Sequence, residues 1–328
     1  MLTGKCELPY TFGMPSPLLF LLASLIWGST FWAITLQLGQ VPPMVSVAYR
    51  FALAAAVLFG YCLLRGQRLG LPWRSQRWLM AQGFLTFGLS YICTYSAEQY
   101  LVSGLVAVLF ALMVFWTPIC ARLVFGTPIS WRVWAAGAVA VAGVALLFSH
   151  AIGGALLEIG GGAGAAGGHF LLGLALALGA TIASSAGNVI VARIRSESTN
   201  VFLTTAWSMT WGTLLVLAVI AVTGTPLVMP QAPVYWMGLF YLSVFGSVIA
   251  FIAYFTLINR IGAQKAVYVG VTSPVISVLL SIRLEHYRPG PLEWCGMVLC
   301  LASVAWAVRT PRAPAAVPPI ASPVTESP

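Results

Sequence analysis

Ten stretches of mostly apolar residues follow one another along this chain of 328 residues, with short polar loops between them. A helix needs about 20 apolar residues to cross a hydrocarbon core about 30 Å thick. Transmembrane β-strands would show alternating segments of about ten residues, and the sequence contains no such alternation. We therefore predict an all-α membrane protein with ten transmembrane helices. They occupy residues 17–37, 43–64, 78–98, 102–121, 132–149, 170–191, 201–223, 234–256, 265–283 and 291–308.

The charged residues are too few to cover a soluble fold. Only 7% of the residues are charged, whereas a soluble domain carries about 25%. The seven acidic residues are all Glu, because the sequence contains no Asp, and the six cysteines include no C-x-x-C pair. We expect the thiols to pack as small apolar groups, with no metal site and no cofactor. The composition excludes a soluble enzyme, a disordered chain and a disulfide-rich secreted domain.

The Lys and Arg residues predict which side of the membrane each loop faces, because cytoplasmic loops carry an excess of both. Most of the 16 basic residues fall on one side, and the exceptions are Arg283, Arg288 and the membrane-embedded Arg50. We expect a multi-pass protein of the plasma (inner) membrane with both termini in the cytoplasm. The net charge of +9 then reflects topology and attraction to membrane lipid, and nucleic acid is not an expected partner. The cytoplasmic set is Lys5, Arg65, Arg68, Arg74, Arg77, Arg122, Arg132, Arg193, Arg195, Arg260, Lys265, Arg309 and Arg312.

The chain divides into two similar halves. The third and eighth spans contain GLSYICTYSAEQYLVSGLVAVL and GSVIAFIAYFTLINRIGAQKAVYV, which align from Gly88 and Gly246. Because each half has five spans, an odd number, the second half must enter the membrane upside down relative to the first. Inverted repeats are typical of secondary transporters, whose substrate site lies near the midplane where the repeats meet. The predicted domains are a cytoplasmic arm at 1–16, a first repeat at 17–149, a Gly-rich outer linker at 150–169, a second repeat at 170–309 and a Pro-rich disordered tail at 310–328.

Four motifs resemble the EamA-domain branch of the drug/metabolite transporter superfamily. They are IWGSTFWAI at 26–34, PPMVSVAYRFALAA at 42–55, SAEQYLVSG at 96–104 and TSPVISVLL at 272–280. The resemblance covers both halves and implies a 5+5 inverted-repeat fold around a central cavity. It also implies transport of small metabolites, usually export, with members that move amino acids and related compounds.

The chain departs from this family where a Gly-Glu pair usually ends the fourth helix of each repeat. The first repeat has Gly126-Thr127 without an acid, and in the second repeat Glu285 comes about two residues early, before His286-Tyr287. The role that the resemblance implies for this Glu therefore does not carry over directly.

Arg50 is the most informative single residue. It lies about seven residues inside the outer end of the second span, where Arg costs about 2.5–3.5 kcal/mol on insertion scales and usually faces a cavity with a partner. Glu98 is the expected counter-charge, and it shares a helix face with Tyr91 and Tyr95 at spacings of i, i+4 and i+7. We predict that Arg50 and Glu98 form a polar element in the outer half of the cavity, which binds a substrate's carboxylate and amine or locks the outer gate. The alternatives are that Arg50 snorkels to the headgroups and that Glu98 is an exposed helix-end acid.

Other polar and aromatic side chains are candidates for lining the same cavity. Aromatic surfaces with a few placed polar groups are typical of small-molecule sites, whereas small polar residues in spans also serve helix packing. We expect the two tryptophans of the seventh span to face the first span across the repeat axis. The candidates are Trp27, Thr30, Ser184, Asn188, Trp207 and Trp211.

Two prolines lie at equivalent places in the fourth and ninth spans. Pro118 and Pro274 each remove an intrahelical hydrogen bond, so a kink is expected there. Broken helices often mark the site and the gates of transporters. We predict hinge or gate positions, with a simple structural bend as the alternative.

These features favour a secondary transporter that exports a small metabolite, such as an amino acid or related compound, by alternating access. There is no Walker A motif, so ATP is not the direct energy source, and protons are a candidate coupling partner despite the scarcity of membrane-embedded acids. A facilitative, channel-like uniporter is the alternative. An enzyme is not expected, because the His, Cys and acidic residues show no dyad or metal-ligand spacing inside the spans. The oligomeric state is left open.

Overall fold

Helical runs overlap each of the ten predicted stretches. The computed structural model describes residues 14–126, 128–149, 165–194, 200–261 and 269–309. The first half contains α1 (Ser16–Thr35), α2 (Pro43–Leu64), α3 (Trp73–Gln82), η1 (Gly83–Ser90), α4 (Tyr91–Ala97), α5 (Ser103–Ala111), α6 (Met113–Phe125) and α7 (Trp131–Leu147). The second half contains α9 (Ala165–Ile194), α10 (Val201–Thr223), α11 (Pro233–Phe240), η3 (Tyr241–Ile249), α12 (Ala250–Ile261), α14 (Val269–Leu284) and α15 (Pro291–Arg309).

The predicted linker and ends fall mostly outside the described residues. Residues 165–169, which the sequence assigns to the linker, form the start of α9. The remainder of the linker, the first 13 residues and the stretch 310–328 lie outside the described residues.

The local sequence explains where several helices begin and end. Proline occupies the first turn of α2 and α11, where its missing N–H costs nothing. Asn200 caps α10, and its side chain accepts a hydrogen bond from the Phe202 amide. Gly126 and Gly224 follow α6 and α10 with φ values of 68° and 64°, the left-handed conformation that glycine adopts at helix C-termini.

Five continuous helical runs are long and apolar enough to cross a membrane on their own, among the residues described. They are α1, α2, α10, the 168–190 part of α9, and the 233–254 run of α11, η3 and α12. A sixth arises if α5 and α6 are one broken span, since they meet at an angle of 43°. Shorter apolar helices occupy 131–147, 272–284 and 291–306. The protein is thus an all-helical, multi-pass membrane protein, and a total of ten crossings stays a prediction.

The two halves share an unusual local conformation at matching positions. The third and eighth helical runs each change to a π-helix, η1 in the first half and η3 in the second. Gly88 and Gly246, from which the two sequence stretches align, are each the sixth residue of their π-helix. π-helical turns are rare and occur frequently at functional sites.

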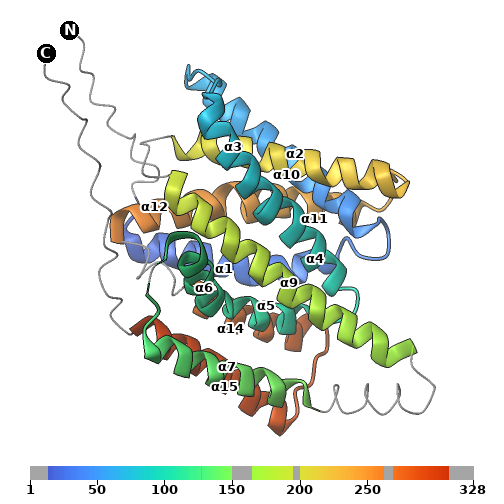
Figure 1. Ribbon diagram of the computed structural model, residues 1–328. Helices are drawn as coiled ribbons and strands as arrows, with labels where there is room; N and C mark the ends of the chain where they lie inside the picture. The colour runs from blue at the N-terminus through green and yellow to red at the C-terminus, as the bar shows by residue number, and fades with distance from the viewer. Residues whose placement is uncertain (1–13, 127, 150–164, 195–199, 262–268, 310–328) are drawn as a thin grey trace, which may run out of the picture.

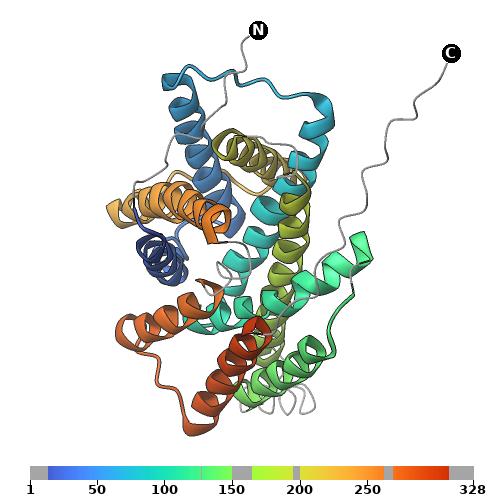
Figure 2. The ribbon, with the colours of Figure 1, turned by 90° about the vertical axis from the view of Figure 1, so that its left-hand side faces the viewer.

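The halves also interlock in a reciprocal way. In the first half α1 packs against η3, α12 and α14 of the second half, whereas α9, the first helix of the second half, packs against η1, α4 and α6. The second helices α2 and α10 pack against each other, and so do the last helices, α7 and α15. Figures 1 and 2 show α7 and α15 side by side at one edge of the molecule. Each of these interfaces therefore joins helices of the first half to helices of the second half.

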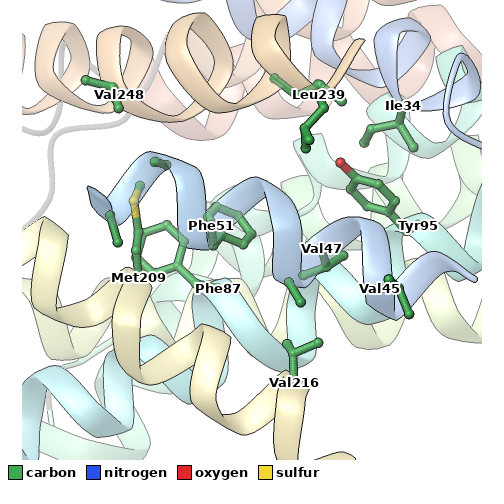
Figure 3. Close-up of a cluster of buried hydrophobic side chains, with 14 of the residues drawn as sticks. Ile34, Val45, Val47, Phe51, Phe87, Tyr95, Met209, Val216, Leu239 and Val248 are labelled. Atoms are coloured by element: carbon green, nitrogen blue, oxygen red, sulfur yellow. The ribbon is translucent and has the colours of Figure 1, made fainter. Parts of the chain in front are cut away.

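The main apolar core lies where α2, α10 and the two π-helices meet. Phe51 of α2 packs edge-on against Phe87 of η1, with ring centroids 5.1 Å apart, and Met209 of α10 and Val248 of η3 belong to the same cluster. Figure 3 shows Phe51, Phe87 and Met209 grouped together, with Val248 on a neighbouring helical run and Tyr95 to one side. This core adjoins Arg50, the basic residue of α2, whose guanidinium lies 5.4 Å from the ring centre of Phe51.

The α7–α15 interface depends on small residues. A Cβ at Gly143 would lie 2.9 Å from Sγ of Cys300, and one at Gly296 would overlap the backbone of Leu147. Small residues of this kind allow helices to approach closely where lipid removes the hydrophobic driving force. The pair is therefore a tightly packed scaffold.

The helix break in the first half does not fall at the predicted proline. The 43° bend separates α5 from α6 at Leu112, six residues before Pro118, which lies inside α6. Proline disturbs the turn on its N-terminal side, so Pro118 accounts for weakened bonding only as far back as Val114. Pro274 lies inside α14, close to the contact of this helix with α1.

Candidate functional site

Arg50 is buried within α2 and donates hydrogen bonds to residues of both halves. Its side chain is 1% exposed, so it does not reach the surface in this structure. Nε donates to Oγ of Ser247 in η3 at 3.0 Å, and Nη1 donates to the hydroxyl of Tyr95 in α4 at 3.4 Å. The snorkelling alternative therefore does not describe this conformation.

These two bonds belong to a longer chain of hydrogen bonds. The Tyr95 hydroxyl donates to Oε1 of Gln37 at 3.1 Å, just beyond the end of α1. At the other side, Oγ of Ser247 donates to the Leu242 carbonyl at 2.9 Å. The resulting polar cluster, Gln37, Arg50, Tyr95 and Ser247, joins α1, α2, α4 and η3.

Aromatic rings enclose the guanidinium. The Arg50 Cζ lies 4.8 Å from the ring centre of Tyr91 and 5.4 Å from that of Phe51, distances at which cation–π attraction is significant. The two rings are themselves packed edge to face, with centroids 4.6 Å apart. Within the described part of the chain, the hydrogen bonds of this cation therefore go to neutral groups.

The π-helix η3 brings the first helix to this cluster. The indole N–H of Trp27 donates to the Gly246 carbonyl at 3.3 Å. A Cβ at Gly246 would lie 2.7 Å from Cγ2 of Thr30 and 3.2 Å from Nη2 of Arg50. Glycine is thus required where α1, α2 and η3 meet.

Trp27 and Thr30 occupy the wall of the site beside α12. The Trp27 ring contacts Phe251 and Tyr254, with centroid distances of 5.2 and 4.9 Å. The Thr30 hydroxyl donates to the Trp27 carbonyl at 2.8 Å, which leaves its methyl group against Gly246. The structure therefore places Trp27, Thr30, Arg50, Tyr91 and Tyr95 together.

Glu98 lies one residue beyond α4 and is buried, with 6% of its side chain exposed. Both carboxyl oxygens are without a hydrogen-bond partner among the described residues. Glu98 interacts electrostatically with Arg50 and with Glu285, but the hydrogen bonds of Arg50 go to Ser247 and Tyr95. The predicted counter-charge is therefore close to Arg50 without being paired to it.

A second polar contact joins the halves next to Glu98. The Glu285 carboxyl accepts from the Ser103 amide at 3.2 Å and, through its other oxygen, from the Ser103 hydroxyl. Ser281 of α14 lies 3.0 Å from the same hydroxyl and accepts from the Gly104 amide at 2.9 Å. Carboxyl groups are stabilising at helix N-termini, so Glu285 caps α5 from the opposite half.

The other predicted residues lie apart from the cluster. The indole N–H of Trp207 donates to the Leu69 carbonyl at 2.9 Å, and that of Trp211 donates to Oε1 of Gln76 at 2.8 Å. Both tryptophans therefore contact the loop and helix after α2, whereas Trp27 contacts α12. Ser184 is half-buried and Asn188 is exposed on α9.

Gln37, Ser247 and Gly246 are not among the residues that the sequence predicts for the site. Gln37 lies at the end of the first apolar stretch, where a polar residue ordinarily marks the interface. Ser247 follows Gly246 at the start of the aligned stretch of the eighth span. A buried amide between two leucines and a Gly-Ser pair inside a span are the only signals that the sequence offers for them.

The cluster has the chemistry of an anion-binding site. A guanidinium presents planar, paired donors that match a carboxylate, and Tyr95 and Ser247 are neutral groups that can exchange partners. The Gln37 amide nitrogen is buried without a hydrogen-bond partner in the described part of the chain. Groups of three or more His, Cys or acidic residues that would hold a metal do not occur among the described residues.

The fold consists of two similar helical halves that interlock around a buried cation. This arrangement is typical of two-repeat membrane transporters. The sequence matches the EamA-like transporter family over residues 14–149 and again over residues 171–309. The chain belongs to this family, and the predicted resemblance to the drug/metabolite transporters is confirmed.

Individual relatives cover different shares of the chain. The uncharacterized inner membrane transporter YedA of Escherichia coli (strain K12) is 27% identical over 285 residues, which are 87% of this chain and 86% of that protein. Protein PagO of Salmonella typhimurium is 31% identical over 96 residues, or 29% of this chain and 32% of that protein. One crystal structure superimposes with a TM-score of 0.61 at 20% identity and covers 89% of this chain and 96% of that chain. At this identity, the likeness to the crystal structure shows the fold alone.

Proposed function

We propose that this protein is a secondary transporter of the inner membrane that exports a small metabolite bearing a carboxylate and an amine, such as an amino acid. The observation that carries the proposal is Arg50, a fully buried cation whose hydrogen bonds go to neutral groups. Burying a charge costs several kcal/mol unless geometry and hydrogen bonds compensate for it. A substrate carboxylate is the compensating group that this geometry invites.

The binding step exchanges one set of partners for another. A carboxylate that approaches Arg50 replaces the long 3.4 Å bond to the neutral Tyr95 hydroxyl with an ion pair, whose two oxygens match the paired donors of a guanidinium. The unpartnered amide of Gln37 lies one hydrogen bond further along the same chain. Tyr91 and Phe51 form apolar walls that suit the carbon skeleton of an amphipathic substrate.

Alternating access follows from the way that the halves interlock. The cluster takes Arg50 and Tyr95 from the first half and Ser247 from the second, so a movement of one half against the other opens or closes it. We propose that the two halves are inverted repeats with both termini in the cytoplasm. This topology puts Arg50, Glu98 and Glu285 toward the outer side.

The test is counterflow in sealed vesicles that contain the purified full chain. We expect saturable exchange of amino acids, and weak exchange of the corresponding amines that lack the carboxylate. Arg50→Ala should lower kcat/KM about 30-fold or more, since breaking a buried charge pair costs about 2–5 kcal/mol. Arg50→Lys should retain part of the activity.

The matched control is Arg68→Ala, which removes the same side chain from an exposed loop position and should transport normally. Normal transport by Arg50→Ala at a normal protein level would refute the proposed site. Flux that does not saturate in the wild-type protein would indicate a channel.

A further inference from the structure

Glu98 is a buried acid that lies within electrostatic range of Arg50, although the hydrogen bonds of Arg50 go to Ser247 and Tyr95. Both of its carboxyl oxygens are buried and lack hydrogen-bond partners among the residues that the structure describes, although a carboxylate taken out of water normally requires several. The group therefore suits a neutral, protonated acid in the conformation described here.

The neighbouring groups point the same way. Glu285, just past α14, interacts electrostatically with Glu98 and already uses both oxygens at the start of α5. Two acids that share a site disfavour simultaneous ionisation, and Glu285 is the one with donors. Among the described residues, Arg50 of α2 and Tyr95 of α4 also interact electrostatically with Glu98, and His169 of α9 lies against Tyr100, two residues after Glu98 along the chain.

The site therefore presents two groups of opposite kind. Arg50 offers donors for a carboxylate, while Glu98 lies within electrostatic range of it and offers two unused acceptor oxygens. The Glu98 carboxylate can bind a proton or an ammonium group. Binding of one weakens binding of the other.

We infer that Glu98 is a shared site at which a proton and the ammonium group of the substrate compete, so that the transporter exchanges one for the other. This inference rests on the proposed function. Facing the cytoplasm, the Glu98 carboxyl releases its O–H proton to water as the substrate ammonium binds the carboxylate. Facing outward, a proton from water binds the carboxylate oxygen and the ammonium leaves. One proton enters for each substrate that leaves, and because the zwitterion is neutral, one positive charge moves inward.

The experiment uses the full chain in vesicles with a pH-sensitive dye inside. Wild-type protein should show proton movement opposite to amino acid movement, and uphill accumulation when a pH gradient is imposed. The KM for the amino acid should rise as pH falls, since protons then occupy Glu98. A deaminated analogue of the same substrate should produce no proton signal.

Glu98→Gln keeps the shape of the neutral acid and has no proton to exchange. It should retain counterflow, with a KM raised about tenfold or more because a hydrogen bond to a charged group is weakened, and it should lose the proton signal and the pH dependence. Glu98→Asp should restore part of both. Glu293→Gln removes an acid at the start of α15, outside the site, and should behave like the wild type.

The outcomes separate the two proposals. Absence of counterflow in the wild type, with amino acids and with related amphipathic metabolites, overturns the proposed function. Normal counterflow without proton movement, or gradient-driven accumulation that survives in Glu98→Gln, overturns the role of Glu98 and leaves the proposed function standing. Loss of folding in Glu98→Gln, checked by size-exclusion chromatography, moves the decision to Glu98→Asp, whose proton signal must then persist.

Discussion

The two π-helices occupy matching places in the two halves and are used in opposite ways. Around η1 the neighbours close in, because a Cβ at Gly83 would overlap the Ser208 carbonyl of α10 and one at Gly88 would lie 2.8 Å from Leu215. Around η3 the equivalent glycine, Gly246, faces the ends of two side chains, because a Cβ there would lie 2.7 Å from Cγ2 of Thr30 and 3.2 Å from Nη2 of Arg50. One π-helix makes a tight helix contact, and the other makes a polar site.

Each π-helix packs against a helix of the other half, α10 for η1 and α2 for η3. These two helices carry different residues at one position that matters for the candidate site. Arg50 is the eighth residue of α2, and Ser208 is the eighth residue of α10. Ser208 is completely buried with its hydroxyl unpartnered among the described residues, whereas Arg50 has two hydrogen bonds and two ring contacts. The two positions correspond when counted from the start of each helix, and of the two side chains only that of Arg50 belongs to the polar cluster.

Gly83→Ala should have the largest effect and should act on stability. The added methyl group meets the backbone of α10, which cannot rotate away as a side chain would, so unfolding should become easier by about 3 kcal/mol or more. Thermal unfolding in detergent measures the change. Gly60→Ala, at a helix position with open space around it, is the matched control, and equal Tm values for the two variants would contradict the close contact at η1.

Gly246→Ala should affect transport more than stability. Its new methyl group meets Cγ2 of Thr30 and the mobile end of Arg50, so the stability loss should stay near 1–3 kcal/mol. Displacement of the guanidinium should lower kcat/KM for amino acid transport by about 10- to 100-fold, the equivalent of about 1.4–2.8 kcal/mol. If Gly246→Ala loses stability as severely as Gly83→Ala and transports normally per folded molecule, the functional difference between the π-helices is wrong.

The sequence predicts the helices of this fold well because long apolar stretches have few other structures in a membrane. The π conformation of Gly83–Ser90 is not predictable in the same way, since its residues are equally suited to an α-helix. The EamA-like family was identified from motifs such as 26–34 and 96–104. The break at Leu112 lies six residues before Pro118, at a position where the sequence has no proline to indicate it, and the role of Pro118 as a hinge stays a prediction.

Prediction of the candidate site from the sequence is limited in the same way. The energetic cost of a buried charge is enough to identify Arg50 from the sequence. Helix periodicity then adds Tyr91 and Tyr95. Ser247 is 197 residues away, so only the tertiary fold reveals it as a partner. Trp207 and Trp211 have the spacing of a cavity stripe, but their indole groups bind Leu69 and Gln76, because α10 begins on the side where that loop lies.

Ser247→Ala should weaken the candidate site by an intermediate amount. The change removes the acceptor for Nε of Arg50, and a hydrogen bond to a charged group contributes about 1.5–3 kcal/mol, so KM should rise about tenfold. Ser243→Ala is the matched control in the same π-helix, because Ser243 is also fully buried but its hydroxyl has no partner among the described residues. Similar KM values for the two variants would separate Ser247 from substrate binding.

Ser208→Ala should have the smallest effect and tests whether the Arg50 position has a silent counterpart. Its hydroxyl is buried without a partner in the described part of the chain, so removing it discards an unmet desolvation cost of about 1–3 kcal/mol against the loss of a few packing contacts. We expect a Tm that is unchanged or slightly higher and a kcat/KM within about twofold of the wild type. A clear loss of transport at unchanged Tm would mean that α10 and η1 also contact substrate during the cycle. The two π-helices would then be alternately open and closed versions of one site, and the asymmetry described here would belong to a single conformation.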